Sequence, residues 1–253
     1  MSWLLAIETS AVRGSVALLR DGVLVCERVL DVPRQHNEML LGEITALLAA
    51  AGIESRALAA LAFGYGPGSF TGVRLAAAAA QAFAWAYELP VFAVDCGEAL
   101  AQLAWRSHDQ LENADQRGAD GRMPPGQQSA RFEGGTDRAQ PDVLVALDAR
   151  MGQLYWLQVS GSRPHTAAAW QVVGWAQIES ECRLAERYIA IGDAWSDPRF
   201  PAAMRRGSIM VYEHAVPQAW DVGALAWQRW TAGERPAPAQ AQPLYLRGAD
   251  AWG

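Results

Sequence analysis

Apolar residues in the first hundred positions occur in short runs and in longer amphipathic stretches, which predict strands and helices. Three short runs come first and predict strands over 3–7, 14–19 and 23–30. The Asp21-Gly22 pair before the last run is typical of a tight hairpin turn, and strands connected so closely pair antiparallel. The pattern that follows predicts a helix over 35–51, a strand over 58–63, a helix to about residue 88, a strand over 91–94 and a helix over 97–105.

This order of elements, β-β-β-α-β-α-β-α, places an antiparallel meander before a parallel α/β portion. The layout is that of a ribonuclease H-like lobe, so we expect a first domain of this kind over residues 1–105. A helix over 217–231, rich in tryptophan, is expected to pack back on this domain.

A second, smaller α/β lobe is expected over 142–216. Its apolar runs predict strands over 142–148, 152–160, 170–175 and 188–192, with a short helix over 178–186. Residues 106–141 between the lobes hold few large apolar side chains, and their composition predicts a flexible insertion or linker. A proline-rich tail over 232–253 follows the last helix.

The composition is that of a soluble globular protein, with 253 residues, 51% of them hydrophobic, and a formal net charge of −6. This charge argues against a chain that holds nucleic acid by a basic surface of its own, because phosphate binding needs clustered Arg and Lys. The three cysteines show neither disulfide nor zinc spacing, which indicates a reducing compartment. The apolar stretch over 75–86 is too short to span a bilayer and the N-terminus has no signal-peptide pattern, so we expect a cytoplasmic protein without membrane contact.

The stretch over 63–74, Phe-Gly-Tyr-Gly-Pro-Gly-Ser-Phe-Thr-Gly-Val-Arg, is the most unusual in the chain. It joins an apolar strand to an alanine-rich helix through a turn that ordinary residues could not trace. Such a turn can hold a phosphate on its backbone N–H groups, or it can set the angle of the helix that follows. In the second interpretation, which we favour, the structural residues of the turn are Gly64, Pro67, Gly72 and Arg74.

A phosphate or nucleotide at this turn would be contacted by Glu8, Thr9, Ser10, Gly66, Gly68 and Ser69. The segment 8–10 ends the first strand, but no glycine follows Glu8 to allow close approach of a phosphate, so a polar strand end is the favoured interpretation. Ser69 is expected to be the N-cap of the next helix rather than a nucleophile, because the sequence offers no residue that can be assigned as its base.

The helix after the turn is apolar around most of its circumference. Its polar residues fall on one stripe, which contains Thr71, Arg74, Ala78, Gln81, Trp85 and Glu88. The helix before the turn also carries more apolar side chains than one core stripe needs. Either other elements of the same chain or a second protein covers this excess, and we favour a partner. The expected interface residues are His36, Met39, Leu40, Ile44, Leu47, Val73, Ala76, Ala77, Ala80, Phe83 and Tyr87.

Four short segments together resemble the bacterial TsaB family. They are Ile7-Glu8-Thr9-Ser10, the stretch over 66–74, Asp148-Ala149-Arg150 and Tyr245-Leu246-Arg247. The resemblance covers nearly the whole chain except residues 106–141. It implies the ASKHA fold of actin, sugar kinases and Hsp70, an α/β fold built from two ribonuclease H-like lobes with mixed sheets.

The resemblance also implies a function. Members of the family are non-catalytic scaffolds that activate the paralogue TsaD when it forms N6-threonylcarbamoyladenosine next to the anticodon of tRNAs reading codons that begin with A. The implied partners are TsaD, bound through the two helices of the first lobe, the ATPase TsaE, and a second copy of the chain as a homodimer. Transfer RNA is expected to bind only through the complex, and ATP only within it.

The spacing of the histidines favours a chain that is not an enzyme. The related TsaD holds a metal through a His-x-x-x-His pair. In this chain the histidines all lie more than four residues apart: they are His36, His108, His165 and His214. We therefore expect no metal site, no catalytic residue and no cofactor bound by this chain alone. The alternative is an active ASKHA-type phosphotransferase or peptidase-like hydrolase that uses the cleft between its lobes. Asp148 and Arg150 share one face of their strand, and they form either contacts in that cleft or a surface ion pair.

Overall fold

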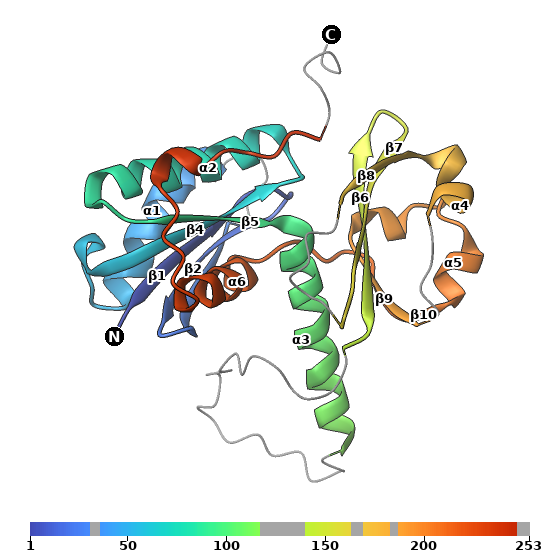
Figure 1. Cartoon of the computed structure of the whole chain (residues 1–253), viewed down its shortest axis with the longest axis horizontal. Helices are drawn as coiled ribbons and strands as arrows, with labels where there is room; N and C mark the ends of the chain where they lie inside the picture. Colours follow the sequence, from blue (N-terminus) through green and yellow to red (C-terminus); the bar gives the residue numbers. More distant parts are fainter. Residues whose placement is uncertain (31–35, 117–139, 163–168, 183–186, 247–253) are drawn as a thin grey trace. The chain divides into compact units, whose positions relative to one another are not determined.

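The structure, a computed structural model, describes residues 1–30, 36–116, 140–162, 169–182 and 187–246 and divides into two compact units (Figure 1). The first unit holds the described residues up to Ala99 together with Pro217 to Tyr245. The second unit holds the described residues from Leu100 to Val216 and Leu246. Each unit is built on a five-stranded sheet.

The first sheet begins with the meander that the short apolar runs predict. Its antiparallel strands are β1 (Trp3–Glu8), β2 (Gly14–Arg20) and β3 (Val23–Leu30). Two further strands, β4 (Leu58–Gly66) and β5 (Val91–Asp95), continue the sheet parallel to β1. The strand order is β3-β2-β1-β4-β5. The central strands β1 and β4 are almost wholly buried, because helices cover both faces of the sheet.

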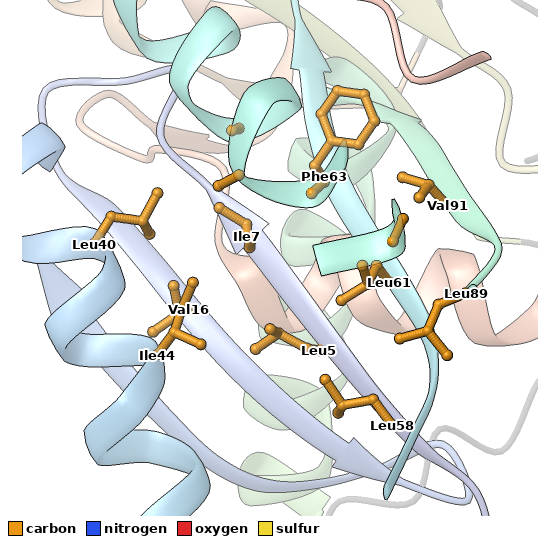
Figure 2. Close-up of a cluster of buried hydrophobic side chains, with 14 of the residues drawn as sticks. Leu5, Ile7, Val16, Leu40, Ile44, Leu58, Leu61, Phe63, Leu89 and Val91 are labelled. Atoms are coloured by element: carbon orange, nitrogen blue, oxygen red, sulfur yellow. The ribbon is translucent and has the colours of Figure 1, made fainter. Parts of the chain in front are cut away.

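Two layers of helix enclose this sheet. On one face lie α1 (His36–Ala50) and α2 (Phe70–Tyr87), and Figure 2 shows Leu40 and Ile44 of α1 beside the side chains of the strands. On the opposite face, α6 (Ala219–Thr231) and the first turn of α3 (Cys96–Gln116) pack on the alternate side chains of the same strands. The helix expected over 217–231 therefore lies on the first unit. Short 3-10 turns occur at Ser55–Ala57 and Pro238–Gln240.

The second sheet repeats the topology of the first. Its antiparallel meander consists of β6 (Asp142–Arg150), β7 (Gln153–Val159) and β8 (Gln171–Gly174). The strands β9 (Tyr188–Ile191) and β10 (Ser208–Tyr212) then add parallel to β6. The strand order, read from the other edge, is β8-β7-β6-β9-β10. It matches the order β3-β2-β1-β4-β5 of the first sheet when β1 to β5 are replaced by β6 to β10. Two ribonuclease H-like lobes of one topology make the ASKHA fold, so this prediction is confirmed.

The helices that follow β8 in the second unit are short. They are α4 (Ile178–Glu181) and α5 (Ala202–Arg206), with 3-10 turns at Trp175–Gln177 and Asp193–Ser196. Trp195, fully buried, lies in the apolar cluster that these elements form with one face of the sheet. The sequence analysis includes neither α5, which is too short to display a helical period, nor β10, whose apolar run over 209–212 is a signal that could have found it.

α3 corrects the expectation that residues 106–141 form a flexible insertion. The helix continues to Gln116, so residues 106–116 are helical. Leu100 and Trp105 pack in the second unit, where Trp105 Nε1–H donates to the Pro141 carbonyl at 2.8 Å. A helix anchored in this way extends through polar residues at little cost, because nucleation is already complete. Residues 117–139 lie outside the described part of the chain.

Candidate functional site

The segments that the sequence singled out lie together at one edge of the first sheet. β1, β4 and β5 are parallel, so their carboxyl ends share that edge. Glu8 ends β1, Gly66 ends β4 and Asp95 ends β5. The glycine-rich turn leaves β4 here and enters α2, beside residues 8–10. The structure therefore brings the predicted segment 8–10 and the predicted turn into contact.

Glu8 is the centre of a small buried polar cluster. Its Oε1 accepts the Ser10 N–H at 2.5 Å, and its Oε2 lies 3.4 Å from Cys96 Sγ. Burial raises the pKa of Glu8, against the lowering effect of the Ser10 hydrogen bonds. Burial also raises the pKa of the Cys96 thiol well above its usual value, and the nearby Glu8 carboxylate acts in the same direction. A thiol that is fully buried in this way is a poor candidate for a reactive nucleophile.

The glycine-rich turn is closed by the chain itself. A Cβ on Gly72 would lie 1.9 Å from the Thr9 carbonyl oxygen, so the chain needs glycine at this position. Thr9 Oγ1–H donates to the Gly72 carbonyl at 2.7 Å, and the Ser69 N–H donates to the Ser10 carbonyl at 2.6 Å. A phosphate would have to compete with residues 8–10 for this turn. The contact supports the interpretation of the turn as the junction that sets the direction of α2.

Ser69 is the N-cap of α2, as its position in the sequence predicts. Its Oγ accepts the Gly72 N–H at 3.4 Å, and its carbonyl accepts the Val73 N–H at 2.9 Å. Caps of this kind stabilise a helix by about 1 kcal/mol. The hydroxyl therefore has a structural role at the start of α2.

The sequence analysis did not single out a second acidic residue at this edge, Asp95, or its neighbour Glu98. Asp95 Oδ1 accepts the N–H groups of Gly97 at 2.7 Å and Glu98 at 3.3 Å, and its Oδ2 accepts the Tyr65 hydroxyl at 3.2 Å. Burial, and then the charge of Asp95, raise the pKa of Glu98 to about 7. A signal was available, because an aspartate just before the helix predicted over 97–105 is a typical N-cap.

The two histidines whose side chains the structure describes lie on different elements. His108 lies on α3 and His214 follows β10, while the side chain of His36 and the whole of His165 fall outside the described residues. In the described part of the chain, no three His, Cys, Asp or Glu side chains are grouped so that they could hold a metal ion. None of the described helices is long and apolar enough to cross a membrane.

Most residues that the sequence assigned to a partner interface lie in the core of the first unit. Seven of them are at most 4% exposed: Leu40, Ile44, Leu47, Val73, Ala76, Ala77 and Ala80. All of them except Val73 belong to the apolar cluster of which Figure 2 shows a part, so their own unit covers them. Met39 and Phe83 are half-buried against the same cluster. We correct these seven positions to core residues, because each of two helices on one sheet buries a wide apolar arc.

A different face of the same helices is exposed. On α2, Trp85 is 71% exposed and Tyr87 is 41% exposed, and Ala78, about two turns before Trp85, also reaches solvent. On α1, Leu41 is 58% exposed. We call the stripe of Ala78 and Trp85 on α2 the exposed helical face, since Leu41 lies on the other helix and Tyr87 lies about half a turn around α2 from Ala78. Among the expected interface residues whose side chains are described, Tyr87 alone is exposed. The side chain of His36 lies outside the described residues.

Arg74 ties the start of α2 to the C-terminal segment. Its Nε–H donates to the Tyr245 hydroxyl at 2.8 Å, and its guanidinium lies 3.6 Å from the centroid of the Phe70 ring. Tyr245 begins the last of the four segments that carry the family resemblance, and Arg74 ends the second. These two segments therefore meet in the first unit.

The chain is similar over nearly its whole length to proteins called tRNA threonylcarbamoyladenosine biosynthesis protein TsaB. The protein of Escherichia coli K12 is 29% identical over 98% of this chain and 96% of its own length. The protein of Haemophilus influenzae is 29% identical over 98% of this chain and 95% of its own length. The solved structure of YeaZ from Pseudomonas aeruginosa matches with 30% identity and a TM-score of 0.75, over 97% of this chain and 100% of that one.

The chain belongs to the bacterial TsaB family.

A family model described as TsaD, tRNA N6-adenosine threonylcarbamoyltransferase, matches residues 30–113. This range includes the glycine-rich turn, α1, and α2 with the exposed helical face. A second solved structure from Pseudomonas aeruginosa, described as an uncharacterized protein with similarity to peptidase YeaZ, matches with 30% identity and a TM-score of 0.73. The TsaB likeness therefore covers both lobes, whereas the likeness to TsaD covers a third of the chain that includes the turn.

The third segment of the family pattern ends β6 in the second unit. Arg150 Nη1 lies 3.0 Å from Asp148 Oδ2, and Asp148 Oδ1 accepts the Arg150 N–H at 2.9 Å. Asp193, whose pKa burial raises, accepts the Asp148 N–H through Oδ1 at 2.9 Å. The Arg150 side chain is 77% exposed, so its pairing contributes about 0–1 kcal/mol. This is the surface ion pair that was one of the two alternatives for these residues.

Proposed function

We propose that this chain takes part in the biosynthesis of tRNA threonylcarbamoyladenosine. The observation that carries the proposal is its similarity, over nearly the whole chain, to proteins named for that biosynthesis in Escherichia coli and Haemophilus influenzae. The formal net charge of −6 supports a role in which other subunits supply the basic surface for tRNA.

Within that biosynthesis the chain has a non-catalytic role, as the subunit that keeps TsaD active. The polar groups that the sequence marked at the edge of the first sheet support this role, because Glu8, the glycine-rich turn and Ser69 each have a structural use. Glu8 is buried against Ser10 and Cys96, the glycine-rich turn is filled by residues 8–10, and Ser69 caps α2. In this proposal ATP binds within the complex with TsaD and TsaE rather than to this chain alone.

The exposed helical face is the surface that we assign to TsaD. Trp85 at 71% exposure is an anchor of the type that dominates protein interfaces. Ala78 on the same stripe allows another helix to approach to the short end of the range of about 8–10 Å between helix axes. A second copy of the chain would use the same face, so self-association and TsaD binding would compete. TsaE and tRNA then join the complex rather than this chain by itself.

Trp85→Ala tests this assignment. Its affinity for purified TsaD, measured by analytical ultracentrifugation, should fall about tenfold or more, because the side chain is a central aromatic anchor. The circular dichroism spectrum and Tm should stay unchanged, since Trp85 is largely exposed. Met151→Ala is the matched control: Met151 is 75% exposed on the second unit, and its loss should leave the affinity unchanged. Equal affinities for wild type and Trp85→Ala would contradict the assignment.

A separate assay tests the non-catalytic role. The purified chain, incubated with ATP and Mg²⁺ without its partners, should release no phosphate above the blank. Turnover that a folded Glu8→Gln variant has lost would instead support the ASKHA-type phosphotransferase or hydrolase.

A further inference from the structure

After α6 the chain returns across the first unit as an extended segment (Figure 1). Its first part, residues 236–241, is firmly attached, and we call it the anchor. The Pro236 carbonyl accepts the N–H of Val91 in the edge strand β5 at 3.1 Å. Ala241 is fully buried in the apolar cluster under α2, and its carbonyl accepts the Gln81 Nε2–H at 2.7 Å. Releasing the anchor would therefore expose part of the core.

The part that follows, residues 243–245, is attached through one backbone hydrogen bond and through side chains that are partly or largely exposed, and we call it the latch. The Leu244 N–H donates to the Tyr65 carbonyl at 2.8 Å, and Arg74 Nε–H donates to the Tyr245 hydroxyl at 2.8 Å. The guanidinium of Arg74 lies 3.6 Å from the Phe70 ring centroid and 5.5 Å from that of Tyr245. Tyr245 is 48% exposed and Phe70 is 37% exposed. Contacts so close to water contribute little each, so the latch can open locally without unfolding of the unit.

The latch and the exposed helical face share one stripe of α2. Arg74, Ala78 and Trp85 follow one another at helical spacing on the solvent side of the helix. A partner helix that lies along this stripe and contacts Trp85 reaches Arg74 if it covers the full length of α2. At that end of the stripe the partner helix would meet Tyr245, whose hydroxyl already accepts a hydrogen bond from Arg74.

We propose that the latch opens while the anchor stays closed, and that the closed latch competes with the partner for the first two turns of α2. Opening takes the Tyr245 side chain away from Arg74 and from the Phe70 ring, so the C-terminal segment limits how strongly the helical face binds. The identity of the partner, TsaD, rests on the proposed function, whereas the opening of the latch does not.

Residue-specific hydrogen exchange of the full chain, followed by NMR, tests the opening. The amide of Leu244 reports the latch, and the amide of Val91 reports the anchor. Arg74→Ala should speed exchange at Leu244 about tenfold, through local opening, and leave Val91 unchanged. Arg20→Ala is the control, because it removes an exposed arginine 5.4 Å from the Trp3 ring and should change neither amide. A Leu244 rate that ignores Arg74→Ala, or an equal acceleration at Val91, overturns the proposal.

The affinity for TsaD tests the competition. Tyr245→Ala weakens the latch and leaves α2 intact, so binding should become up to about tenfold tighter as the open fraction grows. Unchanged or weaker binding overturns the competition. Failure of the proposed function would look different: Trp85→Ala would have no effect on TsaD binding, while the Leu244 amide would still respond to Arg74→Ala.

Discussion

At Gly64 and Gly72 the chain has no room for a Cβ, since one would lie 1.7 Å from Glu8 Oε2 and the other 1.9 Å from the Thr9 carbonyl oxygen. In both cases the obstructing atom belongs to the chain's own first strand or the residue after it. The sequence predicts a turn that only glycine can trace, but it does not reveal what approaches the turn. Thr9 and Gly72 are 63 positions apart, and no local pattern reports such a contact.

Gly72→Ala should therefore lower the free energy of unfolding by about 3 kcal/mol, because the new methyl group meets a backbone carbonyl that is held by β1. Gly42→Ala in α1 is the matched control. Nothing lies within 4 Å of a Cβ at Gly42, so this exchange should raise the stability by about 0.5–1 kcal/mol through helix propensity. Urea denaturation measures both. Wild-type stability for Gly72→Ala would mean that residues 8–10 do not pack on the turn.

Glu98 gives the protein a pH dependence with a defined sign. Its pKa is raised from 4.5 to about 7, so between these values the folded protein holds a proton that the unfolded chain has released. The free energy of unfolding should consequently fall as the pH rises from 4.5 to about 7, and the raised pKa of Glu8 acts in the same direction. Urea denaturation at pH 5 and pH 8 should show a smaller loss for Glu98→Gln than for wild type. An identical loss would show that Glu98 is ionised normally.

At the scale of elements, the hydrophobic pattern predicts the existence and order of every strand and α-helix from β1 to α3, but not the 3-10 turn over 55–57. It fails for α5, which is too short to display a helical period, and where an anchored helix runs into polar sequence, as in α3, and β10 was missed although its residues 209–212 are apolar. It also cannot tell which partner covers an apolar helix. The stripe that it marks as polar on α2 is the exposed stripe, but the apolar remainder packs on the sheet of the same unit.

Two alanines of α2, only two positions apart, allow a comparison of a core position with a surface position. Ala80 is fully buried, so Ala80→Glu should lower the free energy of unfolding by about 3–5 kcal/mol by burying an unpaired charge. Ala78 is exposed, so Ala78→Glu should leave the stability within about 0.5 kcal/mol of wild type while it weakens TsaD binding. Thermal denaturation and ultracentrifugation of the two variants make the comparison. A stable Ala80→Glu protein that had lost TsaD binding would restore Ala80 to the interface.

At the scale of the whole molecule, both sheets follow one strand order, so the chain contains the same lobe twice. The order of elements predicts the first lobe. The second lobe was predicted only in part, because the short helix α5 and the strand β10 were not recognised in the sequence. The TsaB likeness extends over both lobes, and the match to the TsaD model covers residues 30–113. A family fold whose polar edge is filled by its own residues is consistent with a subunit that binds and activates a related enzyme.

The most direct test of this account is the amount of N6-threonylcarbamoyladenosine in tRNA, measured by mass spectrometry after reconstitution with TsaD, TsaE, ATP and the substrates of the modification. The nucleoside should form when this chain is present, should be lost when it is omitted, and should be strongly reduced with Ala78→Glu. The chain without TsaD should form none. Equal amounts with and without this chain, or formation by the chain alone, would contradict its role as a non-catalytic activator.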